Sequence, residues 1–455
     1  MRDSPLSVGE TVRLRLDSLA VGGEAVGRYQ GLAVFALWGC PGEEAEVEIT
    51  HLAPRFARGV VRKVILPSPD RVAPPCPHFG DCGGCQLQHI SYQAQLRHKT
   101  TMVRDAVTRI GRLADVAVGE TWGMKEPWCY RGRAEYQAHV DESGQVTLGF
   151  ARHRSHEIVA VGRCRVQHPL SEQVRAALLE LIPRLAQGPG ERTAFLKLDT
   201  LVSHASGKAI ATLVCDGQPP FLPSAAEALM REVPDLIGVC ASRQRGMRAV
   251  HRSPARPLAG RPHLTESLGE GEYRISPDSF FQVNPQQAAR IVALVQEWAE
   301  VSRGHVVVDT YSGVGTFLLP LARAARQAAG IESEESALTD ARANLRRWRL
   351  SNVTLYKGEV ERILPRLAER GWQPQVVVLD PPRKGCGPAV CAAVARLRPR
   401  RVILVSCHPA TLARDLKTLA EHGYPARRVQ PVDMFPQTWH VEAVALCEHG
   451  ATAED

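Results

Sequence analysis

The pattern of hydrophobic and polar positions divides the chain into parts of different character. Residues 8–65 form short runs in which apolar and polar positions alternate, such as TVRLRLDSL and EEAEVEIT, and glycine-rich turns separate these runs. Alternation with a period of two is typical of strands with one buried face. The runs predict a small five-stranded barrel, and the segment LPSPDRVAPPCP that follows them predicts a linker.

A second pattern begins near residue 288, where short apolar runs alternate with helical spans. The apolar runs are HVVVD, QAAGIE, NVTLY, QVVVLD and RVILVS, and the later runs RVQPVDMF and HVEAVALCE predict two closing strands. Such alternation is typical of an open, mostly parallel sheet with helices on both faces. Between the two patterns, residues 92–112 and 171–185 predict helices and residues 130–161 predict strands.

We therefore expect an α/β protein of three parts. Residues 1–66 are expected to form an OB-type β-barrel that binds RNA, and residues 67–270 an α+β central domain. Residues 271–455 are expected to form a Rossmann-like domain, on which the helix at 92–112 is able to pack.

The charges of the chain point to a nucleic-acid partner. The 455 residues include 56 basic and 48 acidic ones, which gives a formal net charge of +8. Residues 236–265 hold no Asp or Glu, yet they hold Arg243, Arg245, Arg248, Arg252, Arg256 and Arg261. Uncompensated guanidinium groups predict contact with phosphates, the alternative being a solvated loop. The sequence shows no signal peptide and no run approaching 18 apolar residues, which predicts a cytoplasmic protein without a membrane-spanning segment.

Three of the twelve cysteines lie close together in CPHFGDCGGCQLQH. Cys76, Cys82 and Cys85 have the spacing C-x5-C-x2-C, and two glycines allow the loop to fold around a metal. The fourth ligand has to come from elsewhere, and Cys129 and Cys164 are the candidates. Zinc and an iron-sulfur cluster both suit four thiolates. The sequence therefore predicts a metal site, and the remaining isolated cysteines Cys40, Cys215, Cys240 and Cys447 are predicted to be packed thiols.

Two motifs at strand ends have the residues of a nucleotide site. In VVVDTYSGVGTF, Gly313 and Gly315 let the backbone approach a ligand closely, or simply form a turn. Glu332, about 20 residues further on, is placed to hydrogen-bond ribose hydroxyls. The third glycine of a dinucleotide site is missing, which favours S-adenosylmethionine over a nicotinamide cofactor. In VVVLDPPRKG, two prolines hold Asp380 at the end of its strand, for a substrate or only as a rigid loop.

The run RVILVSCHP ends its strand on Cys407, where functional groups gather in parallel sheets. A thiolate that adds to C6 of a pyrimidine turns C5 into a nucleophile able to accept a methyl group. A base must then remove the C5 proton, and Glu442 is a candidate, with His440 as its competitor. Cys386 and Cys391 are rival thiols beyond a strand end.

The ordered set of motifs resembles a known family over essentially the whole chain. SFFQVNP, DTYSGVGTF, DPPRKG, SCHP and FPQTWHVE follow a barrel and C-x5-C-x2-C. Together they resemble the RNA uridine-C5 methyltransferases with a TRAM domain and an iron-sulfur cluster, in particular the 23S ribosomal RNA 5-methyluridine methyltransferases. The resemblance implies a TRAM barrel and a C-terminal class I methyltransferase domain of the Rossmann-like type.

The resemblance also implies roles for single residues. It makes Cys407 the nucleophile and Glu442 the base that removes the C5 proton. The residues that it places at the methyl donor are Gln282, Tyr311, Glu332 and Asp380. It implies a 4Fe-4S cluster held by Cys76, Cys82, Cys85 and Cys164, with Cys164 favoured over Cys129. Two positions depart from the common pattern: Ser312 stands where cysteine is frequent, and His408 where asparagine is frequent.

We therefore expect an enzyme that transfers a methyl group from S-adenosylmethionine to C5 of a uridine in structured RNA. The target base has to leave its stack before a thiol can reach C6. We favour 23S rRNA as the substrate and expect a monomer. The alternatives are a transfer-RNA T-loop uridine, methylation of cytosine C5, and an RNA-binding iron-sulfur protein without activity.

Overall fold

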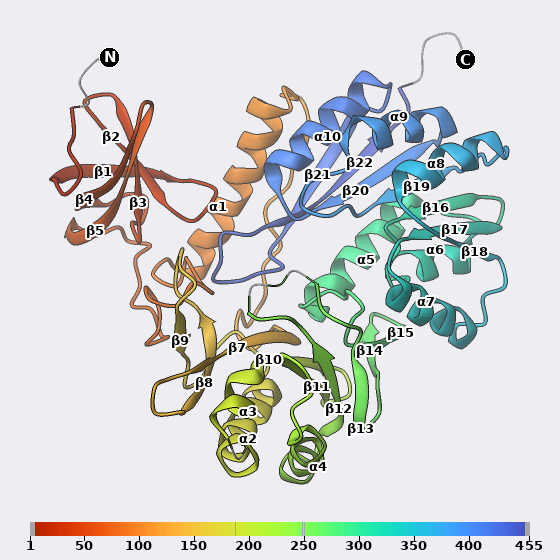
Figure 1. The fold of residues 1–455 in the computed structure, drawn as a ribbon. Coiled ribbons are helices and arrows are strands. Elements are labelled where there is room, and N and C mark those ends of the chain that lie inside the picture. The colour runs from red at the N-terminus through yellow and green to blue at the C-terminus, as the bar shows by residue number, and fades with distance from the viewer. Residues whose placement is uncertain (1–4, 187, 248, 250, 451–455) are drawn as a thin grey trace.

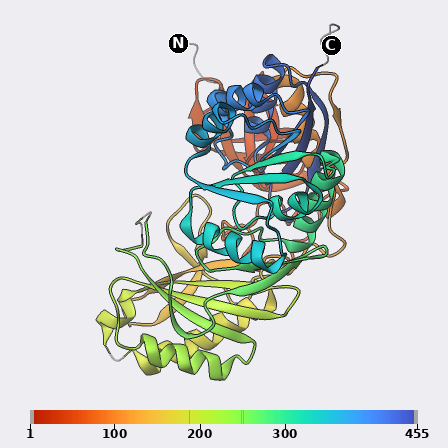
Figure 2. The same cartoon turned by 90° about the vertical axis from the view of Figure 1, so that its right-hand side faces the viewer.

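The computed structural model describes residues 5–186, 188–247, 249 and 251–450. Three large β-sheets and a two-stranded hairpin make up the described part of the molecule (Figure 1). Figures 1 and 2 both show the central sheet at one end, and the barrel and the C-terminal sheet together at the other. No helix of the described part is long and apolar enough to cross a membrane.

The N-terminal sheet is a closed barrel with the strand order β1-β2-β3-β5-β4, as the alternating pattern predicts. On β1, every second residue from Val12 to Leu16 is buried in the barrel. Gly59 lets two strands approach, because a Cβ there would lie 2.5 Å from Val47 Cγ1. The strands are β1 (Thr11–Leu19), β2 (Ala25–Tyr29), β3 (Leu32–Leu37), β4 (Glu44–Ala53) and β5 (Phe56–Leu66).

The central sheet has the order β13-β12-β11-β10-β7-β8-β9. Helices α2 and α4 lie together against one face of it, and Leu178 and Leu229 pack there on Leu198 and Leu213 (Figure 1). The elements are β7 (Arg133–Val140), β8 (Val146–Ala151), β9 (Ile158–Ala160), α2 (Pro169–Leu185), α3 (Pro189–Ala194), β10 (Phe195–Ser203), β11 (Lys208–Cys215), α4 (Leu222–Glu232), β12 (Leu236–Arg243) and β13 (Arg256–Gly260).

The C-terminal sheet has the order β18-β17-β16-β19-β20-β22-β21-β6. Strands β16 to β20 are parallel, and β22 lies antiparallel between β20 and β21. The strands are β16 (Val306–Thr310), β17 (Gln327–Glu332), β18 (Val353–Lys357), β19 (Val376–Leu379), β20 (Arg401–Ser406), β21 (Ala426–Val432) and β22 (Glu442–Glu448). The predicted parallel sheet with two closing strands is confirmed.

Helices cover both faces of this sheet, and its inner strands β16, β19 and β20 are fully buried. Val307 and Val378 pack into one core, whereas the neighbouring residues Val308 and Val377 pack into the other. The helices are α5 (Pro285–Ala299), α6 (Leu318–Ala324), α7 (Glu335–Arg347), α8 (Val360–Glu369), α9 (Gly387–Leu397) and α10 (Pro409–Glu421). The strand order reverses between β16 and β19, and a ligand crevice forms at such a point, outside the carboxyl ends of the strands.

Two segments that precede the C-terminal sheet in sequence pack against it. Helix α1 (Tyr92–Asp105) continues into a short π-helix, η1 (Ala106–Ile110), which contacts α10. Strand β6 (Ala117–Val118) then extends the sheet by pairing with β21. The hairpin of β14 (Leu264–Leu268) and β15 (Gly271–Ile275) packs against α5 and α7.

Candidate active site and cysteine pocket

Asp380, Cys407 and Glu442 meet at one edge of the C-terminal sheet. Asp380 follows β19 and Cys407 follows β20, and these neighbouring parallel strands end together. Ser406 pairs with Ala443, so Glu442, the first residue of β22, stands beside Cys407. The topology therefore brings a thiol and two carboxyl groups to the same place from three separate strands.

The surroundings of these groups shift their proton affinities. Burial, with the charge of Asp380, raises the pKa of Glu442 to about 8, although Arg383 acts against this. Burial also raises the pKa of Asp380 to about 7. Burial and the Glu442 charge raise the pKa of Cys407 to about 11, again against Arg383. The thiol is thus protonated in the free protein at neutral pH, and Arg383 is the cation that favours its thiolate.

The loop after β16 is a tight turn tied to the end of β17. Tyr311 has the left-handed φ of 61°, and its hydroxyl has no hydrogen-bond partner among the described residues. The Gly313 N–H donates to Glu332 Oε2 at 2.8 Å, and Oε1 of Glu332 accepts from two further backbone N–H groups. Gly315 has a φ of 98°, and a Cβ there would lie 1.8 Å from Leu319 Cδ1. Glycine is therefore required at this position.

Asp309 lies fully buried in β16 beside this loop. Burial and then the charge of Asp380 raise its pKa well above the ordinary value, while the Leu318 N–H acts in the opposite direction. Ser312, the residue that departs from the common pattern, is buried, and its hydroxyl has no partner within the described chain.

Gln282 lies, partly exposed, in the loop between β15 and α5. The same loop holds Asn284, whose Oδ1 accepts from the Gln287 N–H and so caps α5. Asn284 Nδ2 donates to the Met434 carbonyl at 3.2 Å. The loop that carries Gln282 is thereby tied to the segment that leads to Glu442.

The rival residues have different surroundings. Burial lowers the pKa of His440 to about 4, helped by Arg383 and Lys99, so its imidazole is neutral and a weak base. His408 caps α10 by accepting from the Thr411 N–H. Cys386 and Cys391 are buried in the core beneath the sheet, which is the ordinary environment of a packed thiol.

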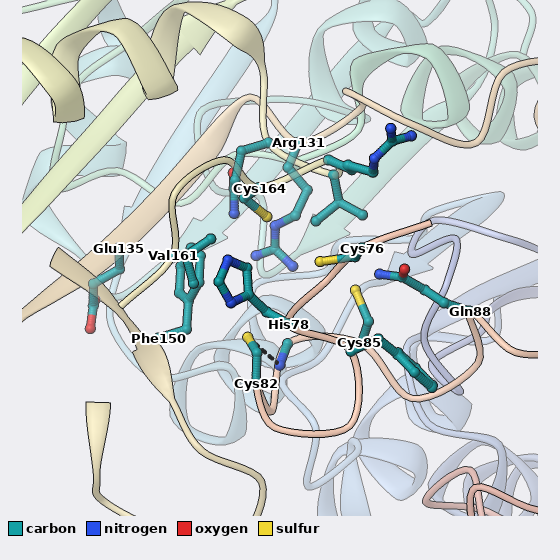
Figure 3. A pocket seen from close by; sticks show the side chains of 15 residues that line it. Cys76, His78, Cys82, Cys85, Gln88, Arg131, Glu135, Phe150, Val161 and Cys164 are labelled. Atoms are coloured by element: carbon teal, nitrogen blue, oxygen red, sulfur yellow. Dashed lines mark hydrogen bonds between the residues drawn. The ribbon is translucent and has the colours of Figure 1, made fainter. Parts of the chain in front are cut away.

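A second site is a pocket lined by four of the cysteines (Figure 3). Cys76, Cys82 and Cys85 come from the loop before α1, and Cys164 comes from the segment between β9 and α2. Cys129 does not line this pocket, and its N–H donates to the Arg165 carbonyl. Burial raises the pKa of Cys164 to about 11.

The cysteine pocket has the residue types that bind a metal through thiolates, but its side chains are not arranged around a single ion. Among the described residues, no group of three or more His, Cys, Asp or Glu side chains is arranged to hold a metal ion. The four thiols instead surround a cavity that also contains His78 and Arg131. Four thiols that line one pocket are the type of donor that zinc and iron-sulfur clusters take.

The arginine-rich segment is less uniform than its sequence suggests. Arg252 forms ion pairs with Asp199 and Asp278, so the expectation of six uncompensated charges is wrong at this position. The acids come from β10 and from the loop after β15, which the local sequence does not show. Arg248 lies outside the described residues. The others are exposed: Arg243, Arg245, Arg256 and Arg261.

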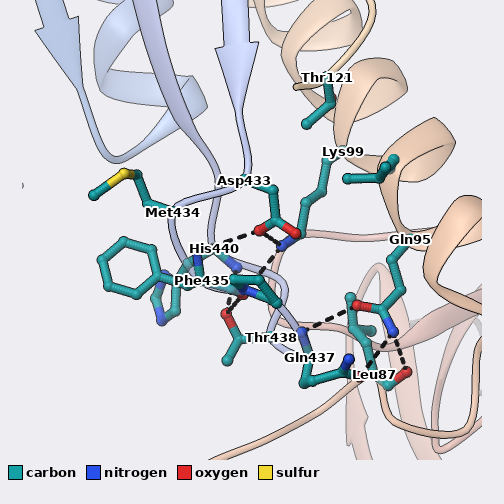
Figure 4. A network of polar contacts seen from close by, with 12 residues as sticks. Leu87, Gln95, Lys99, Thr121, Asp433, Met434, Phe435, Gln437, Thr438 and His440 are labelled. Atoms are coloured by element: carbon teal, nitrogen blue, oxygen red, sulfur yellow. Dashed lines mark hydrogen bonds and ion pairs between the residues drawn. The ribbon is translucent and has the colours of Figure 1, made fainter. Parts of the chain in front are cut away.

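Sequence reasoning missed a group of polar residues beneath the site. Lys99 of α1 forms a fully buried ion pair with Asp433, 334 positions away (Figure 4). Gln95 of the same helix hydrogen-bonds Gln437. The local sequence shows a lysine and a glutamine on the apolar face of a helix. Their spacing does not predict which residues they contact.

The fold and the site define a class of protein. A parallel sheet with its reversal at β16, a glycine turn and an acid at the end of β17 form a class I methyltransferase-like fold. Residues 91–449 match the family described as tRNA (Uracil-5-)-methyltransferase. The chain belongs to this family, and it is an S-adenosylmethionine-dependent RNA (uracil-C5)-methyltransferase.

Similar proteins cover the chain from end to end. An uncharacterized RNA methyltransferase of Halalkalibacterium halodurans is 35% identical over 98% of this chain and 99% of its own length. Another, of Gloeobacter violaceus, is 37% identical over 97% of both chains. The crystal structure of Pyrococcus abyssi tRNA (uracil-54, C5)-methyltransferase in complex with S-adenosyl-L-homocysteine is similar with a TM-score of 0.74 and 26% identity, covering 96% of this chain and 100% of that one.

Proposed function

We propose that the protein methylates C5 of a uridine in structured RNA through a covalent bond between Cys407 Sγ and C6 of the base. The observation that carries this proposal is the meeting of Cys407, Glu442 and Asp380 at one sheet edge with Arg383 as their nearby cation. A thiol beside a carboxyl group that can take up a proton is what addition and elimination at a pyrimidine require.

Cys407 and Glu442 each act at a different step of the proposed reaction. The Cys407 thiolate adds to C6, and the electron pair of the C5=C6 bond moves to C5. C5 then attacks the methyl carbon of S-adenosylmethionine, the bond between that carbon and the sulfonium sulfur breaks, and S-adenosylhomocysteine leaves. The Glu442 carboxylate then removes the proton from C5, the double bond re-forms and the bond between C6 and Cys407 breaks. A carboxyl group with a pKa of about 8 is a stronger base than an exposed glutamate, which favours Glu442 over His440 for this step.

The methyl donor is proposed to lie in the crevice at β16. The residues that would hold it are Gln282, Tyr311, Gly313, Gly315, Glu332 and Asp380. Three backbone N–H groups fix the carboxylate of Glu332, and its remaining lone pairs can accept from ribose hydroxyls.

We propose a 4Fe-4S cluster at Cys76, Cys82, Cys85 and Cys164, because these four thiols line one pocket. For the substrate we favour 23S rRNA, on the resemblance of the barrel and the cysteine loop, with the enzyme acting as a monomer. A tRNA T-loop uridine is the second candidate, because the similar Pyrococcus abyssi enzyme is named for tRNA uracil-54. Mapping 5-methyluridine in the rRNA and tRNA of cells with and without this gene would decide between them.

The mechanism is tested by the covalent species that accumulates. The variant Glu442→Gln should attack and methylate the base but fail to release it, so labelled RNA should stay with the protein on a denaturing gel. Cys407→Ala should give neither the adduct nor methylated RNA, while it still binds S-adenosylmethionine. An equally strong retarded band from Cys407→Ala would assign the nucleophile to another thiol.

A further inference from the structure

A buried ion pair lies under the segment that leads to Glu442. Lys99 and Asp433 are both fully buried. Lys99 Nζ donates to Asp433 Oδ1 and also to the Phe435 carbonyl, at 3.2 Å. Asp433 Oδ2 accepts from the Tyr92 hydroxyl at 2.9 Å, and Oδ1 accepts from the Phe435 N–H. The pair and its neighbours thus fix the turn at residues 433–435 from inside the protein (Figure 4).

Stability alone is a poor explanation for this pair. Removing two charges from water is costly, and their attraction offsets the cost only when the geometry is good. Apolar residues of similar size often stabilise a core as well or better. What the ion pair adds is direction, because each hydrogen bond restricts where the backbone of the turn can lie.

The turn is connected to the reacting groups by a short chain of contacts. The Phe435 carbonyl accepts from the Thr438 hydroxyl at 2.8 Å, and the His440 N–H donates to that hydroxyl oxygen at 3.3 Å. The Trp439 ring lies 6.3 Å from the ring of His408, the residue that follows Cys407. Glu442 comes two residues after His440, so a shift of the turn would move it relative to Cys407.

Helix α1 and the cysteine loop hold the same segment at a second point. The side chain of Gln95 exchanges hydrogen bonds with Gln437, accepting from its N–H at 3.1 Å and donating to its Oε1 at 3.0 Å. The N–H groups of Gln86 and Leu87 both donate to the Gln437 carbonyl. Gln437 has a φ of 70°, a left-handed conformation that is unfavourable for glutamine and persists where the surroundings impose it.

We propose that Lys99 and Gln95 are positioning residues, which hold the segment 433–440 so that Glu442 reaches the C5 proton after Cys407 has attacked the base. This role rests on the proposed function above. Neither residue touches the reacting atoms, so their loss should affect the proton-removal step more than the earlier steps.

The test separates the two steps in a single turnover. In Lys99→Met, transfer of the labelled methyl group to RNA should stay within about twofold of the wild-type rate, since Cys407 follows β20 and the donor turn at Gly313 is tied to Glu332 of β17. Decay of the protein–RNA adduct should slow by about 10- to 100-fold, as expected for a reacting group displaced by a fraction of an ångström to one ångström. Gln95→Leu should act in the same direction.

Controls separate positioning from folding. Lys208→Met makes the same substitution in an exposed ion pair of the central sheet, with Asp235, and should leave both rates unchanged. The double variant Lys99→Met/Asp433→Leu removes both buried charges, so it leaves no unpaired carboxylate in the core. Its protein–RNA adduct should decay more slowly than that of the wild type, as in Lys99→Met. If Lys99→Met does not fold, the double variant decides.

Two results would overturn the inference and one would overturn the proposed function instead. Adduct decay at the wild-type rate in the folded variants would show that the pair does not position Glu442. Methyl transfer and adduct decay that fall by the same factor would show a merely structural role. If neither the wild type methylates RNA nor Glu442→Gln traps it, the proposed function itself fails.

Discussion

Proton affinities at single side chains decide how the site can work. In the proposed mechanism Cys407 has to lose its proton, which its raised pKa opposes, and Glu442 has to gain one, which its raised pKa favours. Arg383 is the nearby cation that lowers the pKa of each of them. The site therefore becomes more reactive as the pH rises towards these values.

The pH dependence of adduct decay follows from the pKa of Glu442. In the proposed role Glu442 can act as a base only when it is ionised, and its raised pKa of about 8 means that the ionised fraction grows as the pH rises through that value. The decay rate in a single turnover should therefore increase between about pH 6 and 9 and then level off. A flat profile over this range would contradict the assignment.

Replacing Arg383 should move that profile. Arg383→Gln removes the charge that lowers the pKa of Glu442, so the inflection should shift to higher pH. Arg400→Gln, a matched change before the opposite end of β20, should leave the inflection in place. The measurement is the same single-turnover decay for each variant.

Cys164 and Cys129 should differ in how much their loss reduces bound iron. Cys164→Ser should strongly reduce the iron bound to protein purified without oxygen, because Cys164 lines the pocket. Cys129→Ser should retain the iron, because Cys129 does not line it. Metal analysis and visible absorbance measure both, and stoichiometric zinc without iron in the unaltered protein would contradict the cluster.

At the level of elements, the fold decides which arginines of the segment from β12 to β14 are paired with acids and which are free to bind phosphates. Arg252 is neutralised by Asp199 of β10 and by Asp278, whereas Arg243 at the end of β12 and Arg256 at the start of β13 remain exposed. These exposed guanidinium groups are the ones available to the phosphates of an RNA.

Replacing Arg243, Arg245 and Arg256 together by Gln should weaken RNA binding and reduce its salt dependence. Each lost phosphate contact should lower the slope of log K against log salt by about 0.7 to 0.9. Arg252→Gln is the control, because it should lower the free energy of unfolding and leave the slope unchanged. An unchanged slope in the triple variant would make this segment a solvated loop.

In the molecule as a whole, a small apolar cluster joins parts that are distant in sequence. Leu19 and Cys40 of the barrel, Leu87 of the cysteine loop, and Ala94 and Met102 of α1 pack together. Trp439, from the segment before Glu442, packs against them. The barrel, the cysteine loop and the catalytic sheet therefore share one contact region.

Truncation of the Leu87 side chain should destabilise this apolar cluster. Leu87 is fully buried, so Leu87→Ala should lower the free energy of unfolding by about 2 to 5 kcal/mol, measured by urea denaturation. Val8→Ala, at a residue that is 63% exposed, should change it by less than about 0.5 kcal/mol. Equal effects of the two changes would show that the cluster does not hold the parts together.

The sequence by itself determined the features that depend on neighbouring residues. Alternating runs in residues 8–65 specify the barrel, and apolar runs between helical spans specify the parallel sheet, because a strand's periodicity reports how its own faces are buried. Asp380 and Cys407 were found in the same way, since parallel strands end at one edge and both residues follow such strands.

Only the tertiary structure decided which distant residues meet. Lys99 pairs with Asp433, β6 joins β21, and Arg252 finds its acids on other elements. Local periodicity records that a side chain is buried but not what it contacts, because the partner depends on how whole elements pack. The contacts of Lys99 and Gln95 with the segment before Glu442 therefore became visible only in the folded chain.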